Sequence, residues 1–343
     1  MNKLKQGKQG KNDLSIIIPH YNREMELIRM LKSIFVQKES ERITIILVDN
    51  KSTYDVQASL RKNFTEEELS RIKYLCNSSN YGAAYNVSKC FTLCKTKWMW
   101  QLSDDDIATE CSLSKIFTYI EADPDIAYFK FLKIEEKQSF EGEENVSNLS
   151  DLISLFENGK VDMGNMIFMS NNVYNMELLV PYLYGAIMYS YTQIGHIIPL
   201  ILALDAGTIR TKFIDEAVVT YKSPDTYNRH AHTRINWGLQ TFCDLDLKIS
   251  NRDWIKLQRF FTAYTLYSAL YNYYHSSFTK RAYMVNKIYS SYTALDNRNC
   301  VADYFVYLFF LVQIKYNIDL IHKIQKLKGT AIYSLLCRIF KKQ

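Results

Sequence analysis

The sequence predicts an α/β fold: a Rossmann-like, mostly parallel sheet that is flanked by helices and followed by a helical C-terminal extension. Short apolar runs alternate with helix-like segments through the first 135 residues, which is typical of a parallel sheet with right-handed crossovers. Several of these runs end at polar residues, as strands do where a ligand binds. Beyond Trp254, aromatic residues recur at a spacing of three and four positions, which predicts the helical extension.

The expected strands follow one another as short apolar runs. Residues 14–18 are mostly β-branched and stop at Pro19, which predicts a fully buried parallel strand. Further strands are expected over residues 43–48, 72–76, 98–102, 126–134 and 217–221. Helices are expected over residues 24–37, 56–63, 66–70 and 80–94. The acidic, polar segment 138–148 predicts a surface loop.

The length and cysteine content limit the domain organisation. The 343 residues exceed the roughly 250 to 300 that one hydrophobic core usually serves, so one larger domain with an appendage is expected. We expect a basic flexible tail over residues 1–12, a main domain over 13–250 and a helical, aromatic and basic region over 251–343. The seven cysteines include no CxxC pair, which argues against a disulfide framework or a zinc site and favours the reduced cytoplasm.

Basic residues are concentrated at the C-terminus, and no acidic residue accompanies them between 320 and 343. They are Lys323, Lys326, Lys328, Arg338, Lys341 and Lys342. Together with the apolar residues after them, they predict a helix that lies on the anionic inner face of the cell membrane. The alternative is a basic helix that packs against its own protein or a partner. No nucleic-acid reader motif accompanies the charge, so nucleic acid is not an expected partner.

Asp104, Asp105 and Asp106 follow the apolar run 98–102 directly. Carboxylates this close repel one another unless a cation lies among them, so the cluster predicts a divalent metal, Mg²⁺ or Mn²⁺, that also binds phosphate oxygens. The alternative is an acidic turn that caps the next helix. Because the carboxyl ends of parallel strands meet at one edge, we expect the cluster to lie close to the polar residues that follow the other strands.

The polar residues after the first two strands suit a nucleotide. Tyr21 would flank a flat base, and Asp49 would accept a hydrogen bond from the imide N–H of uracil or guanine. The alternatives are a core aromatic residue for Tyr21 and a turn with Asn50 and Ser52 for Asp49. Gly82 would let the chain turn tightly into a helix, which is a purely conformational role if no ligand binds there.

Taken together, these motifs resemble family 2 glycosyltransferases of the GT-A fold. They are Pro19-His20-Tyr21-Asn22-Arg23, Val48-Asp49-Asn50-Lys51-Ser52, Asn80-Tyr81-Gly82 with Asn86, and Ser103-Asp104-Asp105-Asp106. The resemblance covers residues 13–135 and, more weakly, 164–175. It implies an inverting transferase with a nucleotide-sugar donor held by Pro19, Tyr21, Asn22, Arg23, Asp49, Asn80, Gly82, Asn86 and Asp104. Many relatives carry an acid where this chain has Asn50 and Ser103, so the division of roles among the aspartates is open.

The resemblance also implies catalytic roles. A metal on Asp104, Asp105 or Asp106 would stabilise the departing nucleoside diphosphate, with Asp105 counted as catalytic. Relatives commonly supply the base from a Glu-Asp pair, but residues 166–204 contain none, and His196 is the expected base. The alternative is that His196 is a core residue. Segment 223–234 resembles a mobile loop over the diphosphate, in which Arg229 would bind phosphate and His230 would complete the metal ligands; the alternative is a solvated basic loop.

The expected function is therefore metal-dependent transfer of a hexose from a nucleotide sugar, UDP-linked by preference, to a glycan or polyprenyl-diphosphate-linked acceptor of capsule or O-antigen synthesis. The enzyme would be cytoplasmic and peripheral on the inner membrane. The alternative is a catalytically inactive GT-A-like scaffold, which Asn50 and the missing Glu-Asp pair favour. A dehydrogenase or a sugar nucleotidyltransferase is disfavoured, because the first strand leads into Pro19-His20-Tyr21 and not into a glycine-rich phosphate turn.

Overall fold

The computed structural model describes residues 13–132, 142–192, 194–221 and 245–261, together with 308, 311 and 312. Residue contacts divide the chain into two compact units, Met1–Tyr227 and Asn228–Gln343. The domain boundary predicted at residue 250 lies inside the second unit and stays a prediction. The N-terminal tail, the segment with Arg229 and His230, and the basic C-terminus lie outside the described residues.

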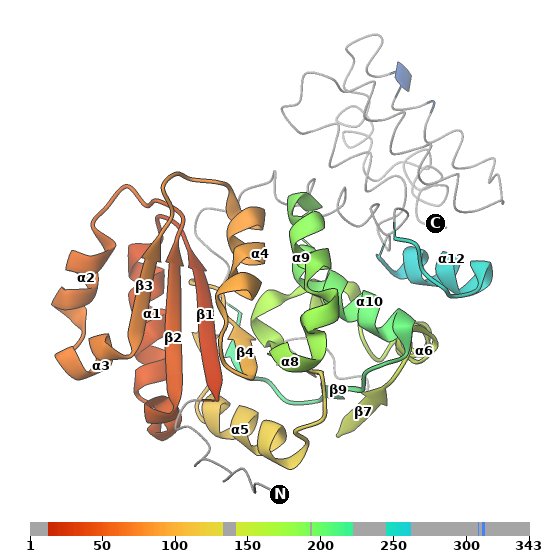
Figure 1. Cartoon of the computed structure of the whole chain (residues 1–343), viewed down its shortest axis with the longest axis horizontal. Helices are drawn as coiled ribbons and strands as arrows, with labels where there is room; N and C mark the ends of the chain where they lie inside the picture. The colour runs from red at the N-terminus through yellow and green to blue at the C-terminus, as the bar shows by residue number, and fades with distance from the viewer. Residues whose placement is uncertain are drawn as a thin grey trace, which may run out of the picture. The chain divides into compact units, whose positions relative to one another are not determined.

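In the described part of the first unit, one eight-stranded sheet has the order β3-β2-β1-β4-β8-β6-β9-β7 (Figure 1). The strands are β1 (Leu14–His20), β2 (Ile43–Asp49), β3 (Ile72–Cys76), β4 (Trp98–Gln101), β6 (Tyr128–Phe131), β7 (Glu143–Val146), β8 (Asn172–Asn175) and β9 (Thr211–Ile214). Two short strands, β5 (Ile107–Ala108) and β10 (Val219–Thr220), pair separately.

Helices flank the sheet, as the sequence predicts. The first unit contains α1 (Glu24–Phe35), α2 (Val56–Asn63), α3 (Glu66–Ser70), α4 (Ala83–Leu93), α5 (Ser112–Ala122), α6 (Leu149–Glu157), α7 (Met163–Ile167), α8 (Met176–Leu179), α9 (Tyr184–Met188) and α10 (Ile198–Ala206). Short 3-10 helices are η1 (Lys38–Arg42), η2 (Met169–Asn171), η3 (Val180–Tyr182), η4 (Ser190–Thr192) and η5 (Gly195–Ile197). The second unit contains α12 (Asn251–Phe261). No helix of the described residues is long and apolar enough to cross a membrane.

Chain direction divides the sheet into two parts. β1 to β4 pair in parallel, so their carboxyl ends meet at one edge. β8 runs antiparallel to both of its neighbours, β4 and β6. β1 is buried on both faces, which explains its almost continuous apolar run. The α/β fold with a flanked, predominantly parallel sheet is confirmed, and the strands β7, β8 and β9 are elements of this sheet that the apolar pattern did not reveal.

Two element predictions need correction. The segment 138–148 is not only a loop, because Glu143–Val146 forms strand β7 at the edge of the sheet. Its acidic side chains concealed it: Glu143 pairs with Lys212 of β9 at 2.6 Å, and charged residues are common on edge strands. The strand expected over 217–221 is shorter and covers only Val219–Thr220.

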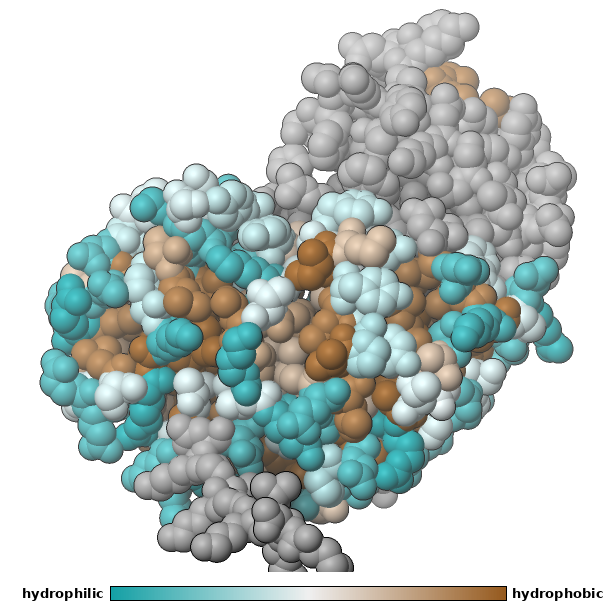
Figure 2. Space-filling view, viewed as in Figure 1, coloured by the Kyte–Doolittle hydropathy of each residue, from teal (hydrophilic) through white to brown (hydrophobic). Residues whose placement is uncertain are grey.

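Large exposed hydrophobic residues are concentrated around α9. They are Leu178, Val180, Tyr184, Ile187, Met188 and Tyr191. Figure 2 shows hydrophobic residues over α9 on the face that it presents, with hydrophilic residues around them. α9 packs against α4, whose first residues follow the motif at Asn80–Gly82. An apolar surface therefore lies beside the helix that leads away from the predicted nucleotide motif.

Candidate functional site

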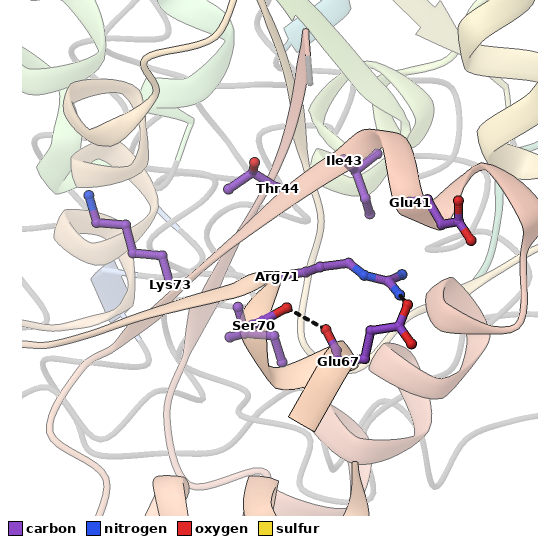
Figure 3. Close-up of a pocket in the computed structure, with 8 residues that line it drawn as sticks. Glu41, Ile43, Thr44, Glu67, Ser70, Arg71 and Lys73 are labelled. Carbon is purple, nitrogen blue, oxygen red and sulfur yellow. Dashed lines mark hydrogen bonds and ion pairs between the residues drawn. The ribbon is translucent and has the colours of Figure 1, made fainter. Parts of the chain in front are cut away.

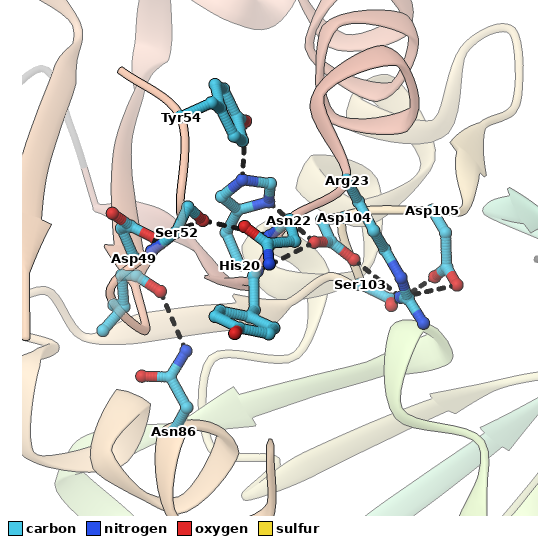
Figure 4. A network of polar contacts seen from close by, with 12 residues as sticks. His20, Asn22, Arg23, Asp49, Ser52, Tyr54, Asn86, Ser103, Asp104 and Asp105 are labelled. Carbon is cyan, nitrogen blue, oxygen red and sulfur yellow. Dashed lines mark hydrogen bonds and ion pairs between the residues drawn. The ribbon is translucent and has the colours of Figure 1, made fainter. Parts of the chain in front are cut away.

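The carboxyl ends of β1, β2, β3 and β4 bring the predicted motifs together. In the strand register His20 lies opposite Asp49, and Asp49 lies opposite Cys76. The aspartate cluster follows β4 directly. Figure 4 shows His20, Arg23 and Asp104 pointing toward one another, with Asp49 and Ser52 beside them. The structure therefore confirms that these motifs meet at one edge of the sheet, and ligand binding at this edge stays a prediction.

Arg23 connects two of the three aspartates. Its Nη1 donates to Asp104 Oδ1 at 2.9 Å and to Asp105 Oδ2 at 2.7 Å. On the other side of Asp104, Oδ2 lies 2.7 Å from His20 Nδ1. Burial opposes the charge on the guanidinium, but the two carboxylates outweigh it and raise the pKa of Arg23. One positive side chain thus lies between two carboxylates, as the repulsion argument required.

Asp105 and Asp106 each accept a hydrogen bond from a serine hydroxyl. Ser103 Oγ donates to Asp105 Oδ1 at 2.5 Å, and Ser170 Oγ donates to Asp106 Oδ2 at 2.5 Å. Burial raises the pKa of Asp105 even though Arg23 and the Ser103 hydroxyl act in the opposite direction. Ser103 therefore orients the carboxylate of Asp105.

The donor set fits a metal that arrives together with phosphate. Asp104 and Asp105 converge on one positive group, and carboxylate oxygens suit Mg²⁺ or Mn²⁺. Across the residues that the structure describes, however, no group of three or more His, Cys, Asp or Glu side chains would hold an ion on its own. Phosphate oxygens of a nucleotide would have to complete the ligand set. Metal binding by Asp104, Asp105 and Asp106 stays a prediction.

Asp49 is held in an ionised state at the end of β2. Burial alone would raise the pKa of Asp49, but hydrogen bonds from Ser52 and from the Tyr74 hydroxyl outweigh it and hold that pKa below its usual value. The backbone N–H of Ser52 donates to Asp49 Oδ1 at 2.9 Å, so the turn that was the alternative interpretation is present. The turn uses Oδ1 of Asp49 and does not exclude a contact between Oδ2 and a nucleotide base. That contact stays a prediction.

Asparagine side chains hold the loop between β3 and α4. Asn50 is 1% exposed, donates to Asn80 Oδ1 at 2.7 Å and accepts the backbone N–H of Tyr81 at 3.0 Å. Asn86 donates to the carbonyl oxygen of Val48 at 2.8 Å and so attaches α4 to β2. Gly82 has a φ of 89°, which only glycine adopts readily. Asn50 therefore shapes the loop, and a direct nucleotide contact by Asn80, Gly82 or Asn86 stays a prediction.

The remaining residues of the first motif have separate roles. Pro19 lies within β1, and Tyr21 is 38% exposed beside Asp104, which accepts its backbone N–H at 3.4 Å. Asn22 has a φ of 54°, and its Oδ1 accepts the backbone N–H of Thr53 at 2.7 Å. Asn22 thus joins the loop after β1 to the loop after β2, and the exposed ring of Tyr21 is available to a ligand.

His196 lies in the core and not at the open edge. It is 3% exposed on η5, and its Nε2 lies 3.0 Å from the carbonyl oxygen of Ile167. No partner for its Nδ1 occurs among the described residues. Burial, reinforced by the positive charge of Lys130, lowers the pKa of His196 to about 4. The placement favours the core alternative, and the role as catalytic base stays a prediction without structural support.

A glutamine at position 196 is expected to flatten the pH dependence of stability. Because the folded-state pKa of His196 lies below its unfolded value, the unfolded chain binds the extra proton, and stability falls as the pH falls from about 6.5 to 4. Over that whole window, the lowering of the His196 pKa from 6.5 to about 4 corresponds to about 3 kcal/mol of lost stability. Urea unfolding at pH 7.5 and pH 5 should show a smaller difference for His196→Gln than for the wild type. A turnover unchanged at pH 7.5 would exclude His196 as the base.

The sequence analysis did not single out Lys130 and Ser170, two residues that support the aspartate cluster. Lys130 of β6 is completely buried, and its ammonium donates to the carbonyl oxygens of Met166 and Phe168 at 3.2 and 3.0 Å, and to the side chains of Asn171 and Asn172. It thereby fixes the segment that carries Ser170, the partner of Asp106. The one available signal was a single lysine inside the apolar run Tyr128–Phe131.

A cavity of about 460 Å³ lies at the opposite, amino ends of β2 and β3 (Figure 3). Thr44, Ile72 and Lys73 line it, together with Glu67 and Arg71, which form an ion pair at 2.8 Å. None of the predicted site residues lines this cavity, and ligands of parallel sheets bind at the carboxyl ends. We therefore assign the candidate site to the aspartate edge.

Comparisons with known proteins concern the family and the fold of this chain. Residues 15–175 match the model of glycosyl transferase family 2. An uncharacterized glycosyltransferase of Haemophilus influenzae is 30% identical over 115 residues, which are 34% of this chain and 37% of that protein. The chain thus matches little more than a third of the length of this relative.

Solved structures share the fold. S. aureus TarS 1–349 in complex with UDP-GlcNAc has a TM-score of 0.59 at 12% identity, over 83% of this chain and 82% of that chain. The same protein in complex with UDP has a TM-score of 0.57 at 12% identity, over 82% and 80%. At such low identity the likeness establishes the architecture. The comparisons therefore support glycosyl transferase family 2 for the domain that contains residues 15–175, which is a little less than half of the chain.

Proposed function

We propose that this protein is an inverting, metal-dependent hexosyltransferase that moves a sugar from a UDP-sugar to a hydroxyl of a glycan or polyprenyl-diphosphate-linked acceptor in capsule or O-antigen synthesis. The observation that carries the proposal is the shared edge at which the ionised Asp49 and the Arg23–Asp104–Asp105 group meet. The first group suits a base, and the second suits a diphosphate with its metal. The match to the family model and the UDP complexes of the S. aureus neighbour support the choice of donor.

The residues divide the work along the edge. Asp49 accepts the base imide, and the exposed ring of Tyr21 flanks the base. Asp104 and Asp105 would hold the divalent ion, which when bound withdraws negative charge from the departing diphosphate. Arg23 lies against the same carboxylates and donates hydrogen bonds to phosphate oxygens when it leaves them. His20 holds the Asp104 carboxylate in place through its contact with Oδ2.

The decisive experiment is a thermal-shift series with UDP, GDP, CMP and dTDP sugars, each measured with Mn²⁺ and with EDTA. A ligand at 100 times its dissociation constant stabilises the folded state by about 2.7 kcal/mol, which moves the midpoint of a domain of this size by several degrees. We expect that shift with UDP-sugars in Mn²⁺ and none in EDTA. No shift with any nucleotide would favour the inactive scaffold.

Membrane association of the C-terminus is part of the proposal. Six basic residues without an acid between 320 and 343 favour attraction to anionic lipid, and the apolar surface around α9 suits a lipid-linked acceptor. A chain that ends at Leu320 is expected to sediment several times less with phosphatidylglycerol vesicles than the full chain, and neither should sediment with phosphatidylcholine. Equal sedimentation of the two chains would rule out the C-terminus as the attachment.

A further inference from the structure

Asp49 carries a full set of hydrogen-bond donors before any nucleotide binds. Its Oδ1 accepts the backbone N–H of Ser52 at 2.9 Å and the hydroxyl of Ser52 at 2.6 Å. Its Oδ2 accepts the Tyr74 hydroxyl at 2.8 Å and the Cys76 thiol at 3.4 Å. An ionised carboxylate offers about four lone-pair sites, so these donors occupy all of them whenever the one hydrogen of the thiol points to Asp49 and not to the Asn77 carbonyl oxygen. A base N–H can bond to Asp49 only if one donor leaves.

The thiol is the donor that leaves at the smallest cost. The two Ser52 donors belong to the turn after β2, and the ring of Tyr74 packs against the hydrophobic core, so none of these moves freely. A thiol is a weak donor, and Cys76 is exposed at the end of β3. Its sulfur already lies 3.3 Å from a second acceptor, the carbonyl oxygen of Asn77. The thiol can therefore release Asp49 and keep a partner.

We infer that Cys76 is a specificity-determining residue of the nucleotide site: its thiol yields Asp49 Oδ2 to the imide N–H of the donor base and turns to the Asn77 carbonyl. This inference rests on the proposed function and concerns its base subsite. Asp49 and Cys76 are paired in the parallel register of β2 and β3, so both side chains lie on the same face of the sheet. A weak donor at this position keeps the carboxylate satisfied when the base is absent and competes little when the base arrives.

The test compares two substitutions of one atom. Cys76→Ser retains a donor, and a stronger one, whereas Cys76→Ala frees the lone pair. Dissociation constants for UDP are measured by calorimetry on the full chain with Mn²⁺. We expect the constant of Cys76→Ser to exceed that of Cys76→Ala by about three- to tenfold, the range of one hydrogen bond. For N3-methyl-UDP, which lacks the imide hydrogen, we expect a ratio near one.

The control is Cys94→Ser, the same exchange beyond the far end of α4, where the sulfur contacts Thr96. It should bind UDP as the wild type does, and the thermal midpoints of all apo variants should agree. Equal UDP constants for the two Cys76 variants, or the same ratio with N3-methyl-UDP, would overturn the inference alone. A wild type that binds neither UDP nor GDP would overturn the proposed function and this inference with it.

Discussion

Replacement of Asp105 by asparagine is expected to reduce glycosyl transfer by about 100- to 1,000-fold, the usual cost of losing one preorganised electrostatic contact in an active site. The amide has nearly the same shape but no negative charge. It would hold neither the Arg23 guanidinium, now 2.7 Å from Asp105, nor a metal ion that binds with the diphosphate. Turnover is measured as release of UDP from the donor, with and without acceptor.

Asp125→Asn is the matched control for this substitution. Asp125 is exposed in the turn before β6, away from the aspartate edge, and the exchange should leave UDP release unchanged. An Asp105→Asn variant that turns over like the wild type would contradict the assignment of the site. A wild type that releases no UDP, with or without acceptors, would instead establish the inactive scaffold.

The second large effect concerns stability. Lys130→Met is expected to lower the free energy of unfolding by about 3 kcal/mol, because the carbonyl oxygens of Met166 and Phe168 and two asparagine side chains would lose their buried donor. Methionine has a similar volume, so a cavity contributes little to the change. Urea unfolding followed by tryptophan fluorescence measures the difference.

Lys73→Met provides the comparison on β3, the strand at one edge of the same sheet. Lys73 lies exposed on β3, where a substitution usually changes stability by less than about 0.5 kcal/mol. If both variants unfold at the same urea concentration, Lys130 does not fix the segment before β8. If Lys130→Met is folded but destabilised, we also expect weaker turnover, since Ser170 and hence Asp106 depend on that segment.

The sequence predicted those features that depend on neighbours along the chain. The buried strands β1 and β2 follow from their apolar runs, and the location of the site follows from the polar residues at their ends. Pairing between distant side chains was beyond this reasoning. The carboxylate cluster was expected to need an inorganic cation, but Arg23, distant in sequence, supplies a positive charge. The burial of His196 was likewise not predictable, because a lone histidine in an apolar segment has the same local sequence whether it is a core residue or a catalytic base.

Strand β7 and Lys130 show the limits of a hydrophobic pattern. The first is a strand in which three of the four residues are polar and two are acidic, so its sequence has the composition of a loop. The second is a charged residue at a fully buried position, which is stable only because several oxygens from one distant segment surround it. Such compensation is a property of the folded chain and leaves no periodic signal.

Because β8 runs antiparallel to β4, the segment that reaches the aspartates comes before β8 in the chain and not after it. In a strand that runs with β4, the residues after its end would reach the aspartates; in β8, which runs against β4, the residues before its start do. Ser170 reaches Asp106 and the backbone N–H of Ser103 by this route. In the proposed enzyme, insertions between β7 and β8 would therefore remodel the surface offered to an acceptor without lengthening the loops after β1 and β2, to which the base contact is assigned. Under that proposal, the choice of acceptor can change independently of the choice of donor.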